Sequence, residues 1–568
     1  MQPLDVLRTC FHLEHFRGIQ KEIIDSVLSR KDTLGLMPTG GGKSLTFQVP
    51  ALCMEGLCLV ITPLVALMRD QVEKLRQRGI LAQMIDASMS AQQIETALRN
   101  CVYGPYKFLY VSPERLSSDT FLRYLSHLKV SLLTVDESHC ISLWGHDFRP
   151  SYLKIADLRD MLKGVPVLAL TATATPRVQD EIQEKLLFKE KNVIRMSFLR
   201  ENLAYSVEKT HDRLESLFRL LESCPGSAIV YTRSRLKCPM ICSEIESRGI
   251  SATFYHAGLD PILKERAQNA WQASEKRVMV ATNAFGMGID KSDVRLVVHF
   301  DIPDSLEAYF QEAGRAGRDG GPSRAVLLYD ASTAAAVLER TAVAFPPQER
   351  IRDIYESLQY YMQMPLGDGM GSRHLLDMET FCRNFRYFPQ MVESALRILE
   401  QSGYLEYKKE EGSRSRLMMT VKRDDLYQMT LSESQEVLIR LLLRNYTGLF
   451  TQYATISETL LSVRSGMDRQ MVYGTLRQLH ERGVVSYVPT GQKAYVTYLM
   501  PRVEKEQIQF TDKVYLTRRK AMEESIGAML GYARSDDVCR SRLLLRHLGE
   551  EAAKDCQKCD VCLNRSES

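Results

Sequence analysis

A glycine-rich segment, MPTGGGKS, has the composition of a phosphate-binding loop. It lies between an apolar strand-like run, TLGLM, and a helix-like segment, SLTFQVPAL. Glycines let backbone N–H groups close around phosphate oxygens at the start of a helix, while Lys43 would reach the β and γ phosphates and Ser44 would hold Mg²⁺. Met37 replaces the first glycine of the usual pattern, so an accidental glycine-rich turn is the alternative for this motif alone. We expect ATP to bind at Thr39, Gly40, Gly41, Gly42, Lys43 and Ser44.

Two adjacent carboxylates, Asp136 and Glu137, end the apolar run LLTVDESH. Carboxylates at the C-terminal tip of a strand face the crevice of a doubly wound sheet. Asp136 would then bind Mg²⁺, and Glu137 would orient and deprotonate an attacking water. A helix-capping Asp followed by a solvated Glu is the structural alternative, and the phosphate-loop motif upstream argues against it.

A third segment, YFQEAGRAGRDG, contributes Gln311, Arg315 and Arg318. Guanidinium groups are always charged and fork-shaped, so they suit γ-phosphate oxygens approached from across an interface. If these arginines complete the site only when two domains close, hydrolysis is coupled to domain motion. A basic glycine-rich surface turn is the alternative.

Four cysteines near the C-terminus follow a C-x16-C-x2-C-x2-C spacing. Thiolates at this spacing suit a tetrahedral structural Zn²⁺, with the helix-like RSRLLLRHL between the first ligand and the others. An iron–sulfur cluster is the rival, although the ferredoxin-type fourth cysteine is absent. His547 is expected to lie on the intervening helix rather than to bind the metal. The expected ligands are Cys539, Cys556, Cys559 and Cys562.

Short apolar runs alternating with amphipathic stretches would position the nucleotide motifs. This alternation is typical of α/β domains with buried parallel strands. Two tandem doubly wound domains are therefore expected, at residues 1–205 and 206–344. The runs are LCLVITPL, KFLYVSPE, VSLLTVDE, PVLALTAT, GSAIVYTR, RVMVATNA, VRLVVHFD and RAVLLYD.

The pattern changes after about residue 345 to amphipathic helices with short strands. An apolar stripe, a glycine and a strand recur there at an offset of 80 residues, in MVESALRILEQSGYLEY and MVYGTLRQLHERGVVSYV. This succession suits the recognition helix and wing of a winged-helix unit. We expect such units at 345–425 and 426–515 and a zinc module at 516–568; two similar helices in an ordinary bundle are the alternative.

Bulk composition is that of a folded globular protein. The 568 residues are 45% hydrophobic and 25% charged, and the net charge of +4 permits contact with polyanions without establishing it. No apolar run of membrane-spanning length and no secretory signal is found, so we expect a cytoplasmic protein, nucleoid-associated if bacterial, with no membrane partner. Thirteen cysteines in such a compartment are expected to be thiols or metal ligands.

As a set, the motifs of residues 1 to about 330 resemble those of the RecQ family of superfamily 2 DNA helicases. The resemblance implies two RecA-like domains, and the CDVCL ending is similar to that of the family's zinc module. The matching stretches are HFRGIQ, MPTGGGKS, ITPLVALMRDQV, YVSPERL, DESHCISLWGHDFRPSY, ALTATAT, AIVYTRSR, FYHAGLD, VATNAFGMGIDKSDVR and QEAGRAGRDG.

The resemblance also assigns roles to two further groups. Gln20, with Arg17 beside it, would recognise adenine. An aromatic-rich loop would sense single-stranded DNA, since aromatic faces stack on any base and arginine follows phosphates; core aromatics under a loop are the alternative. His12 and Leu143 depart from the family pattern, which puts in doubt how finely nucleotide binding and DNA binding are coupled. The loop residues are Trp144, His146, Phe148 and Arg149.

The activity implied is that of an ATP-dependent DNA helicase acting in repair or recombination. By family analogy it would move 3′ to 5′ on single-stranded DNA and unwind forked or tailed duplexes. The order of parts is unusual, because the zinc module follows the winged-helix region and is expected to fold back on the core. A nucleic-acid-stimulated translocase or an RNA helicase is the alternative; a passive scaffold is disfavoured because the residues for hydrolysis are all present. The sequence identifies no protein partner.

Overall fold

The computed structural model describes residues 2–38, 40–86, 89–145, 147–286, 291–410, 415–426, 429, 431–488, 493–551 and 554–567. The chain forms two compact units, each assembled from separate segments. The first unit comprises Met1–Ala257, Ala270–Val337 and Ala521–Ser568, and the second comprises Gly258–Asn269 and Leu338–Lys520. Within the described residues, no helix has both the length and the apolar character needed to cross a membrane.

The first lobe of the first unit is built on a seven-stranded sheet of order β3-β4-β2-β5-β6-β1-β7, in which all pairings are parallel. Helices α2, α3 and α4 pack apolar side chains against this sheet in one core cluster. The strands are β1 Thr33–Leu36, β2 Leu57–Ile61, β3 Ala82–Ile85, β4 Phe108–Val111, β5 Val130–Val135, β6 Val167–Thr171 and β7 Val193–Arg195. The helices are α1 Pro3–Phe11, α2 Gln20–Leu28, α3 Lys43–Cys53, α4 Val65–Gln77, α5 Ala91–Tyr103, η1 Pro113–Arg115, α6 Asp119–Leu125, η2 Ser138–Ile141, η3 Pro150–Lys154, α7 Ile155–Met161 and α8 Pro176–Lys185.

The second lobe repeats this plan with a six-stranded parallel sheet of order β10-β11-β9-β12-β13-β8. Its strands are β8 Leu203–Lys209, β9 Ser227–Tyr231, β10 Ala252–Tyr255, β11 Val278–Ala281, β12 Val294–His299 and β13 Ser323–Tyr329. The helices in this part of the chain are α9 Arg213–Ser223, α10 Lys237–Ser247, α11 Pro261–Gln272, α12 Leu306–Ala313 and α13 Ala331–Ala344.

The expected pair of parallel-sheet domains is confirmed, and each of the eight apolar runs forms a strand. The boundary lies slightly earlier than the expected division after residue 205, because β8 already pairs with β13 in the second sheet. Leu203, Tyr205 and Val207 are buried while the residues between them are partly exposed. This alternation is typical of an edge strand, and it lacks the continuous apolar run that identified the others.

The second unit contains two small antiparallel sheets, of order β14-β19-β15 and β17-β16-β18. Its strands are β14 Arg373–Leu376, β15 Leu405–Glu410, β16 Arg416–Met419, β17 Ala454–Thr455, β18 Val485–Val488 and β19 Lys493–Tyr498. Its helices are α14 Gln348–Tyr361, α15 Met378–Phe385, α16 Pro389–Gln401, α17 Arg423–Leu426, α18 Glu433–Asn445, α19 Glu458–Ser465, α20 Arg469–Glu481 and η4 Lys505–Gln507.

The repeat at an offset of 80 residues is a real structural repeat. Helices α16 and α20 each bury an apolar stripe, and each is followed by a glycine with a left-handed backbone, Gly403 at φ 81° and Gly483 at φ 66°. A glycine in this position ends a helix without the steric cost that a Cβ would add. Strands β15 and β18 follow.

The strand pairing differs from the expected division into units at 345–425 and 426–515. Strand β15 pairs with β19 along its whole length, whereas β16 pairs with β18. The described residues between 416 and 488 therefore form a sheet-and-helix body with its own core, inserted in the chain between the paired strands β15 and β19.

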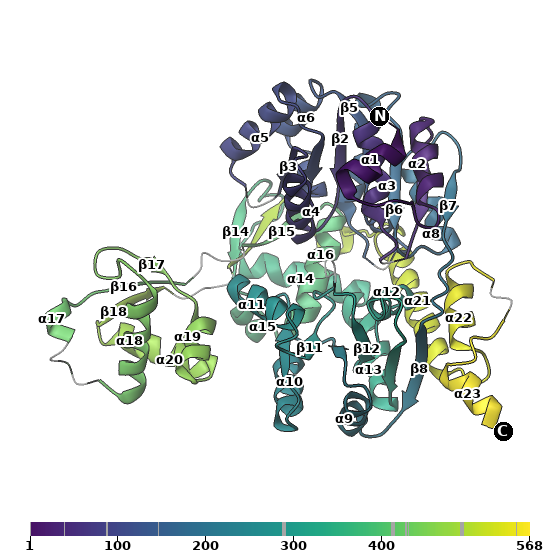
Figure 1. Ribbon diagram of the computed structural model, residues 1–568. Coiled ribbons are helices and arrows are strands. Elements are labelled where there is room, and N and C mark those ends of the chain that lie inside the picture. The colour runs from purple at the N-terminus through teal and green to yellow at the C-terminus, as the bar shows by residue number, and fades with distance from the viewer. Residues whose placement is uncertain are drawn as a thin grey trace. The chain divides into compact units, whose positions relative to one another are not determined.

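The chain ends in helices α21 Leu516–Arg534, α22 Arg540–His547 and α23 Asp560–Glu567. Both α22 and α23 contact β8, and α22 also contacts α12 (Figure 1). The C-terminal module thus folds back on the second lobe, as expected from the order of parts.

Candidate active site and metal centre

The phosphate-loop motif connects β1, in the interior of the first sheet, to the start of α3 at Lys43. Gly40 and Gly42 have left-handed backbones, at φ 86° and 78°. The N–H groups of the first turn of a helix are not used by the helix itself, so this end of α3 can bind an anion. Thr39 lies outside the described residues.

Gln20 holds this loop from the side. Its Nε2 donates to the carbonyl oxygens of Gly41 at 3.1 Å and Gly42 at 3.3 Å, and its Oε1 accepts from the backbone N–H of Arg17 at 2.9 Å. A Cβ at position 42 would lie 2.3 Å from Gln20 Nε2. The positive φ of residue 42 favours glycine, and a Cβ there would displace the Gln20 amide that holds the loop.

The two acidic residues lie at the C-terminal end of β5, where the doubly wound fold predicts them. Asp136 and Glu137 are each 7% exposed, and Lys43 Nζ lies 3.7 Å from Glu137 Oε1. The backbone N–H of Glu137 donates to Asp136 Oδ1 at 3.0 Å. Glu137 itself has a left-handed backbone, φ 47°, which costs energy for a residue with a side chain and is typical of functional sites.

Burial, followed by the neighbouring charge of Glu137, raises the pKa of Asp136 to about 6, against the lowering effect of Lys43. A carboxyl that is hard to ionise in the folded chain favours a ligand that stabilises its charge. A divalent cation is such a ligand, and the oxygen donors of Asp136 and Ser44 fit Mg²⁺.

This pKa predicts how stability depends on pH in the metal-free protein. The folded chain binds the Asp136 proton more tightly than the unfolded chain, so ionisation destabilises the fold as the pH rises from about 4 to 6. Asp136→Asn should therefore increase the free energy of unfolding at pH 7.5 by up to about 3 kcal/mol and change it little at pH 4. Denaturant unfolding in EDTA measures this, with the exposed Asp119→Asn as control. Equal effects of Asp136→Asn at both pH values would contradict it.

A cavity of about 520 Å³ brings the three predicted motifs together. From the first lobe it is lined by Gly40, Gly42, Lys43, Ser44, Asp136 and Glu137, and from the second by Gly286, Gln311, Arg315 and Arg318. Each of the six residues expected to be catalytic lines it.

The arginine segment follows α12 and packs closely at the cavity. Arg315 is 4% exposed and donates to the carbonyl oxygen of Gly286, where a Cβ would collide with its guanidinium. The Arg318 side chain passes Gly40, with its Cγ 3.6 Å from where a Cβ on that glycine would lie. Arg318 therefore reaches the phosphate loop from the opposite lobe, and Arg315 lines the same cavity.

Sequence reasoning missed a pair of residues that orient Ser44. Gln71 Nε2 donates to Ser44 Oγ at 3.2 Å, and Tyr110 OH donates to Gln71 Oε1 at 2.9 Å. Gln71 falls within the stretch ITPLVALMRDQV, which was recognised only as a matching stretch. The contact depends on α4 lying beside α3, which a periodicity cannot indicate.

The aromatic-rich loop closes on η2, directly after Glu137. His139 Nδ1 lies 3.4 Å from Glu137 Oε2 and 2.9 Å from Thr171 Oγ1. A Cβ on Gly145 would lie 2.3 Å from the carbonyl oxygen of His139, so the loop packs directly on this residue. A change in the loop can thus reach the acidic pair through one histidine.

Trp144, Phe148 and Arg149 are all partly exposed. The Arg177 guanidinium carbon lies 3.1 Å from the centroid of the Trp144 ring. Arg149 pairs with Asp147, with nitrogen–oxygen distances of 2.9 and 3.1 Å. His146 lies outside the described residues.

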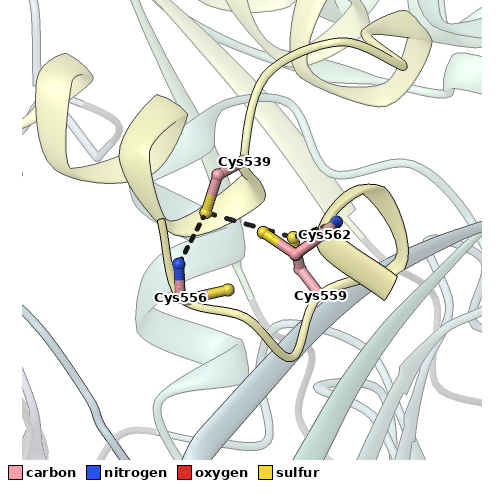
Figure 2. A group of neighbouring side chains, drawn as sticks. All are labelled: Cys539, Cys556, Cys559 and Cys562. Carbon is pink, nitrogen blue, oxygen red and sulfur yellow. Dashed lines mark hydrogen bonds between the residues drawn. The ribbon is translucent and has the colours of Figure 1, made fainter. Parts of the chain in front are cut away.

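The four expected zinc ligands converge at one point (Figure 2). Their Sγ atoms all lie within 4.8 Å of one another, and Cys539 Sγ is 4.0 Å from Cys559 Sγ. Tetrahedral Zn–S bonds place sulfurs about 3.8 Å apart, so the donor set fits Zn²⁺. The backbone N–H of Cys556 donates to Cys539 Sγ and that of Cys562 donates to Cys559 Sγ, and such donors stabilise the negative charge of metal-binding thiolates. His547 instead pairs with Glu307, at 2.8 Å.

The zinc module is bonded to the second lobe and to the segment that joins the two lobes. Arg540, adjacent to the first ligand, pairs with Asp560, whose Oδ2 also accepts from the backbone N–H of Val207 in β8. Glu550 accepts from Ser197 Oγ and from the backbone N–H of Phe198, in the segment that joins the lobes. Folding of this module thus stabilises the lobe junction.

Loss of one zinc ligand should therefore destabilise the protein more than the loss of a single local contact would. Cys559→Ser is expected to abolish zinc binding and to unfold the module, because zinc-binding energy in small modules is largely folding energy. Metal analysis should find one zinc per wild-type chain and none in the variant, with protease cleavage appearing within residues 516–568. Cys224→Ser, at a partly exposed cysteine outside the cluster, should keep its zinc. Full zinc content in Cys559→Ser would contradict the assignment.

Comparisons with known families agree with this division of the chain. The family model for DEAD/DEAH box helicases matches residues 17–182, and that for the helicase conserved C-terminal domain matches residues 211–320. A model described as the RecQ helicase winged-helix domain of Bacteroidota matches residues 417–489, the inserted body. The RecQ zinc-binding model matches residues 504–563.

Curated relatives are similar to more than half of the chain. The ATP-dependent DNA helicase RecQ of Pasteurella multocida is 45% identical over 328 residues, 58% of this chain and 52% of the relative. That of Bacillus subtilis is 45% identical over 322 residues, 56% of this chain and 54% of the relative. The chain thus spans about half the length of these relatives.

A solved structure, the helicase MrfA bound to DNA, shares its fold with more than half of this chain. The TM-score is 0.50 at 17% sequence identity, covering 58% of this chain and 51% of that one.

Proposed function

We infer that this chain, which belongs to the RecQ family of superfamily 2 DNA helicases, is an ATP-dependent DNA helicase. The observation that carries this inference is the cavity lined by Lys43 and Glu137 from one lobe and by Arg315 and Arg318 from the other. A nucleotide in such a cavity contacts both lobes, so its binding and hydrolysis change how the lobes fit together.

For hydrolysis, each lining residue has a task that its chemistry suits. Lys43 binds the β and γ phosphates, and Ser44 and Asp136 hold Mg²⁺, which neutralises phosphate charge when bound. Glu137 orients the attacking water and takes its proton. Arg315 and Arg318 stabilise the charge that develops on the γ-phosphate, and Gln311 lines the same space. Gln20, with Arg17, would recognise the adenine base next to the phosphate loop, which Gln20 holds through its hydrogen bonds.

Single-stranded DNA is proposed to bind across the lobes and to contact the aromatic-rich loop. Trp144, Phe148 and Arg149 offer stacking faces and a cation, and His146 belongs to the same loop. The contact between Gly145 and His139 gives this loop a short path to Glu137. DNA binding can then stimulate hydrolysis.

Trp144→Ala is expected to weaken this stimulation. Removing one base-stacking ring should raise the DNA concentration for half-maximal stimulation of ATP hydrolysis by about 10-fold. A titration with single-stranded oligonucleotide measures the change. Tyr103→Ala, at an aromatic residue 84% exposed at the end of α5, serves as control. An unchanged titration midpoint in Trp144→Ala would remove this loop from the DNA site.

Duplex separation is assigned to the second unit. Winged-helix bodies bind duplex through a recognition helix and basic side chains, and this unit contains two repeats of the helix, glycine and strand pattern. By family analogy, we also propose that the protein moves 3′ to 5′ and acts on forked or tailed duplexes in repair or recombination. In a bacterial cell it would work at the nucleoid.

Strand displacement on a tailed duplex tests the helicase function. The wild-type protein with Mg-ATP should release the labelled strand from a 3′-tailed duplex, and Lys43→Ala should not. ATP hydrolysis stimulated by single-stranded DNA without strand release would favour the translocase alternative. Release from an RNA duplex alone would favour the RNA helicase.

A further inference from the structure

The segment joining the two lobes, residues 196–202, is bonded to the turn that carries the two arginines. Arg200 Nη2 donates to the carbonyl oxygens of Ala316 at 2.9 Å and Gly317 at 2.8 Å, and its Nη1 donates to that of Gly314 at 3.4 Å. These carbonyls lie immediately on either side of Arg315 and just before Arg318. One side chain of the linker therefore fixes the backbone from which both arginines project.

Asn202 completes this attachment. Its Nδ2 donates to the carbonyl oxygens of Gly317 at 2.7 Å and Gly321 at 2.9 Å, and its Oδ1 accepts from Arg200 Nε at 3.3 Å. Gly317 has a left-handed backbone, φ 62°, and a Cβ there would lie 2.4 Å from Asn202 Nδ2. The turn is thus shaped around the linker amide, with no room for another side chain.

The other end of the linker is bonded to the first lobe and to the zinc module. The backbone N–H of Met196 donates to the carbonyl oxygen of Leu36, the last residue of the strand that leads into the phosphate loop, at 2.9 Å. Glu550 accepts from Phe198 at 2.8 Å. A few linker residues thus connect the strand before the phosphate loop to the arginine turn.

We propose that Arg200 and Asn202 are positioning residues that make the placement of Arg315 and Arg318 depend on the setting of the lobe linker. This inference rests on the proposed ATP hydrolysis. A change in the angle between the lobes bends the linker. The hydrogen bonds from Arg200 and Asn202 to the turn then shift the backbone that bears Arg315 and Arg318. The arginines then meet the γ-phosphate only in one setting of the lobes, which ties hydrolysis to the domain motion.

Variants of Arg200 separate positioning from general support of the fold. Arg200→Ala and Asn202→Ala should each lower kcat for DNA-stimulated ATP hydrolysis, by up to about 10²-fold, because small misplacements of a transition-state contact have effects of that size. The KM for ATP should change less than about 2-fold, since the phosphate loop is intact. Arg200→Lys should recover only part of the rate, because an ammonium cannot span three carbonyls as a guanidinium does.

Nucleotide analogues provide a readout that a merely structural role would not change. The variants should bind ADP with aluminium fluoride more weakly by the same factor as kcat falls, and bind the non-hydrolysable AMPPNP as the wild type does. Arg277→Ala is the matched control, because Arg277 also donates to backbone carbonyls of the second lobe, those of Leu221, Cys224 and Gly226, and lines no part of the cavity.

Thermal unfolding measurements identify variants that fail to fold. If Arg200→Ala does not fold, the kinetics of Asn202→Ala and Arg200→Lys test the inference. If the wild type is active, the inference is overturned by a normal kcat in these variants. It is also overturned if the variants bind both nucleotide analogues more weakly by the same factor. A wild-type protein without ATP hydrolysis overturns the proposed function and this inference with it.

Discussion

Arg315→Ala is expected to lower kcat for ATP hydrolysis by about 10³-fold or more. An arginine supplied from across an interface stabilises charge that appears only in the transition state, so its loss lowers kcat far more than it changes ATP binding. Arg315 lines the cavity opposite Lys43 and is almost completely buried. Steady-state hydrolysis at saturating single-stranded DNA measures the effect.

The burial of Arg315 makes controls necessary, because its bond to Gly286 also supports the fold. Arg315→Lys keeps the positive charge but loses the forked guanidinium group, so its kcat for ATP hydrolysis should remain strongly reduced. Arg318→Ala, at the second arginine of the turn, should show a loss of the same kind. Arg324→Ala, at an exposed arginine on β13, should hydrolyse ATP normally. Wild-type kcat in a folded Arg315→Ala protein would contradict the role.

Glu137→Gln should lower kcat by about 10²- to 10⁴-fold while leaving ATP bound. The glutamine amide keeps the shape of the side chain but cannot accept a proton from water. The ion pair with Lys43 is lost as well, which leaves Lys43 free for phosphate, so affinity for ATP should stay the same or increase. Single-turnover hydrolysis and equilibrium binding of a fluorescent ATP separate the two effects.

The exposed Glu190→Gln is the matched control for this charge change. Hydrolysis at the wild-type rate in Glu137→Gln would mean that another group takes the proton. Loss of ATP binding together with hydrolysis would mean that Glu137 supports the site rather than the chemical step.

The interior strands of both sheets could be read from the sequence, and the edge strands could not. Buried parallel strands are apolar on both faces, so they appear as continuous runs. Strands β3 and β7 border the first sheet, and β8 and β10 border the second. Each of these strands contains partly exposed residues and therefore has a mixed composition. Its place in the sheet is decided by pairing with its neighbour rather than by a local sequence pattern.

The second unit shows a different limit. Helix, glycine and strand could be predicted twice from the repeat, because the buried stripe of α16 recurs in α20. Which strand pairs with which could not be predicted. Strand β15 pairs with β19 across some 80 intervening residues, and nothing in a local window distinguishes this from a hairpin with β16.

At the proposed nucleotide site, the groups expected to bind phosphate or Mg²⁺ were predictable because their chemistry requires particular residue types in short motifs. Lys43 and Asp136 are examples. The groups that act through others were not predictable: Gln71 reaches Ser44, and Arg200 reaches the arginine turn, only because of tertiary packing. Their residue types have many ordinary uses on a protein surface, so no spacing marks them.

A crystal structure of the protein with ADP, aluminium fluoride, Mg²⁺ and single-stranded DNA would test the central claim most directly. We predict that the fluoride group lies between Lys43 and Glu137 on one side and the guanidinium groups of Arg315 and Arg318 on the other, within hydrogen-bonding distance of both arginines. A nucleotide bound by the first lobe alone, with both arginines directed away from it in the DNA-bound state, would contradict the account.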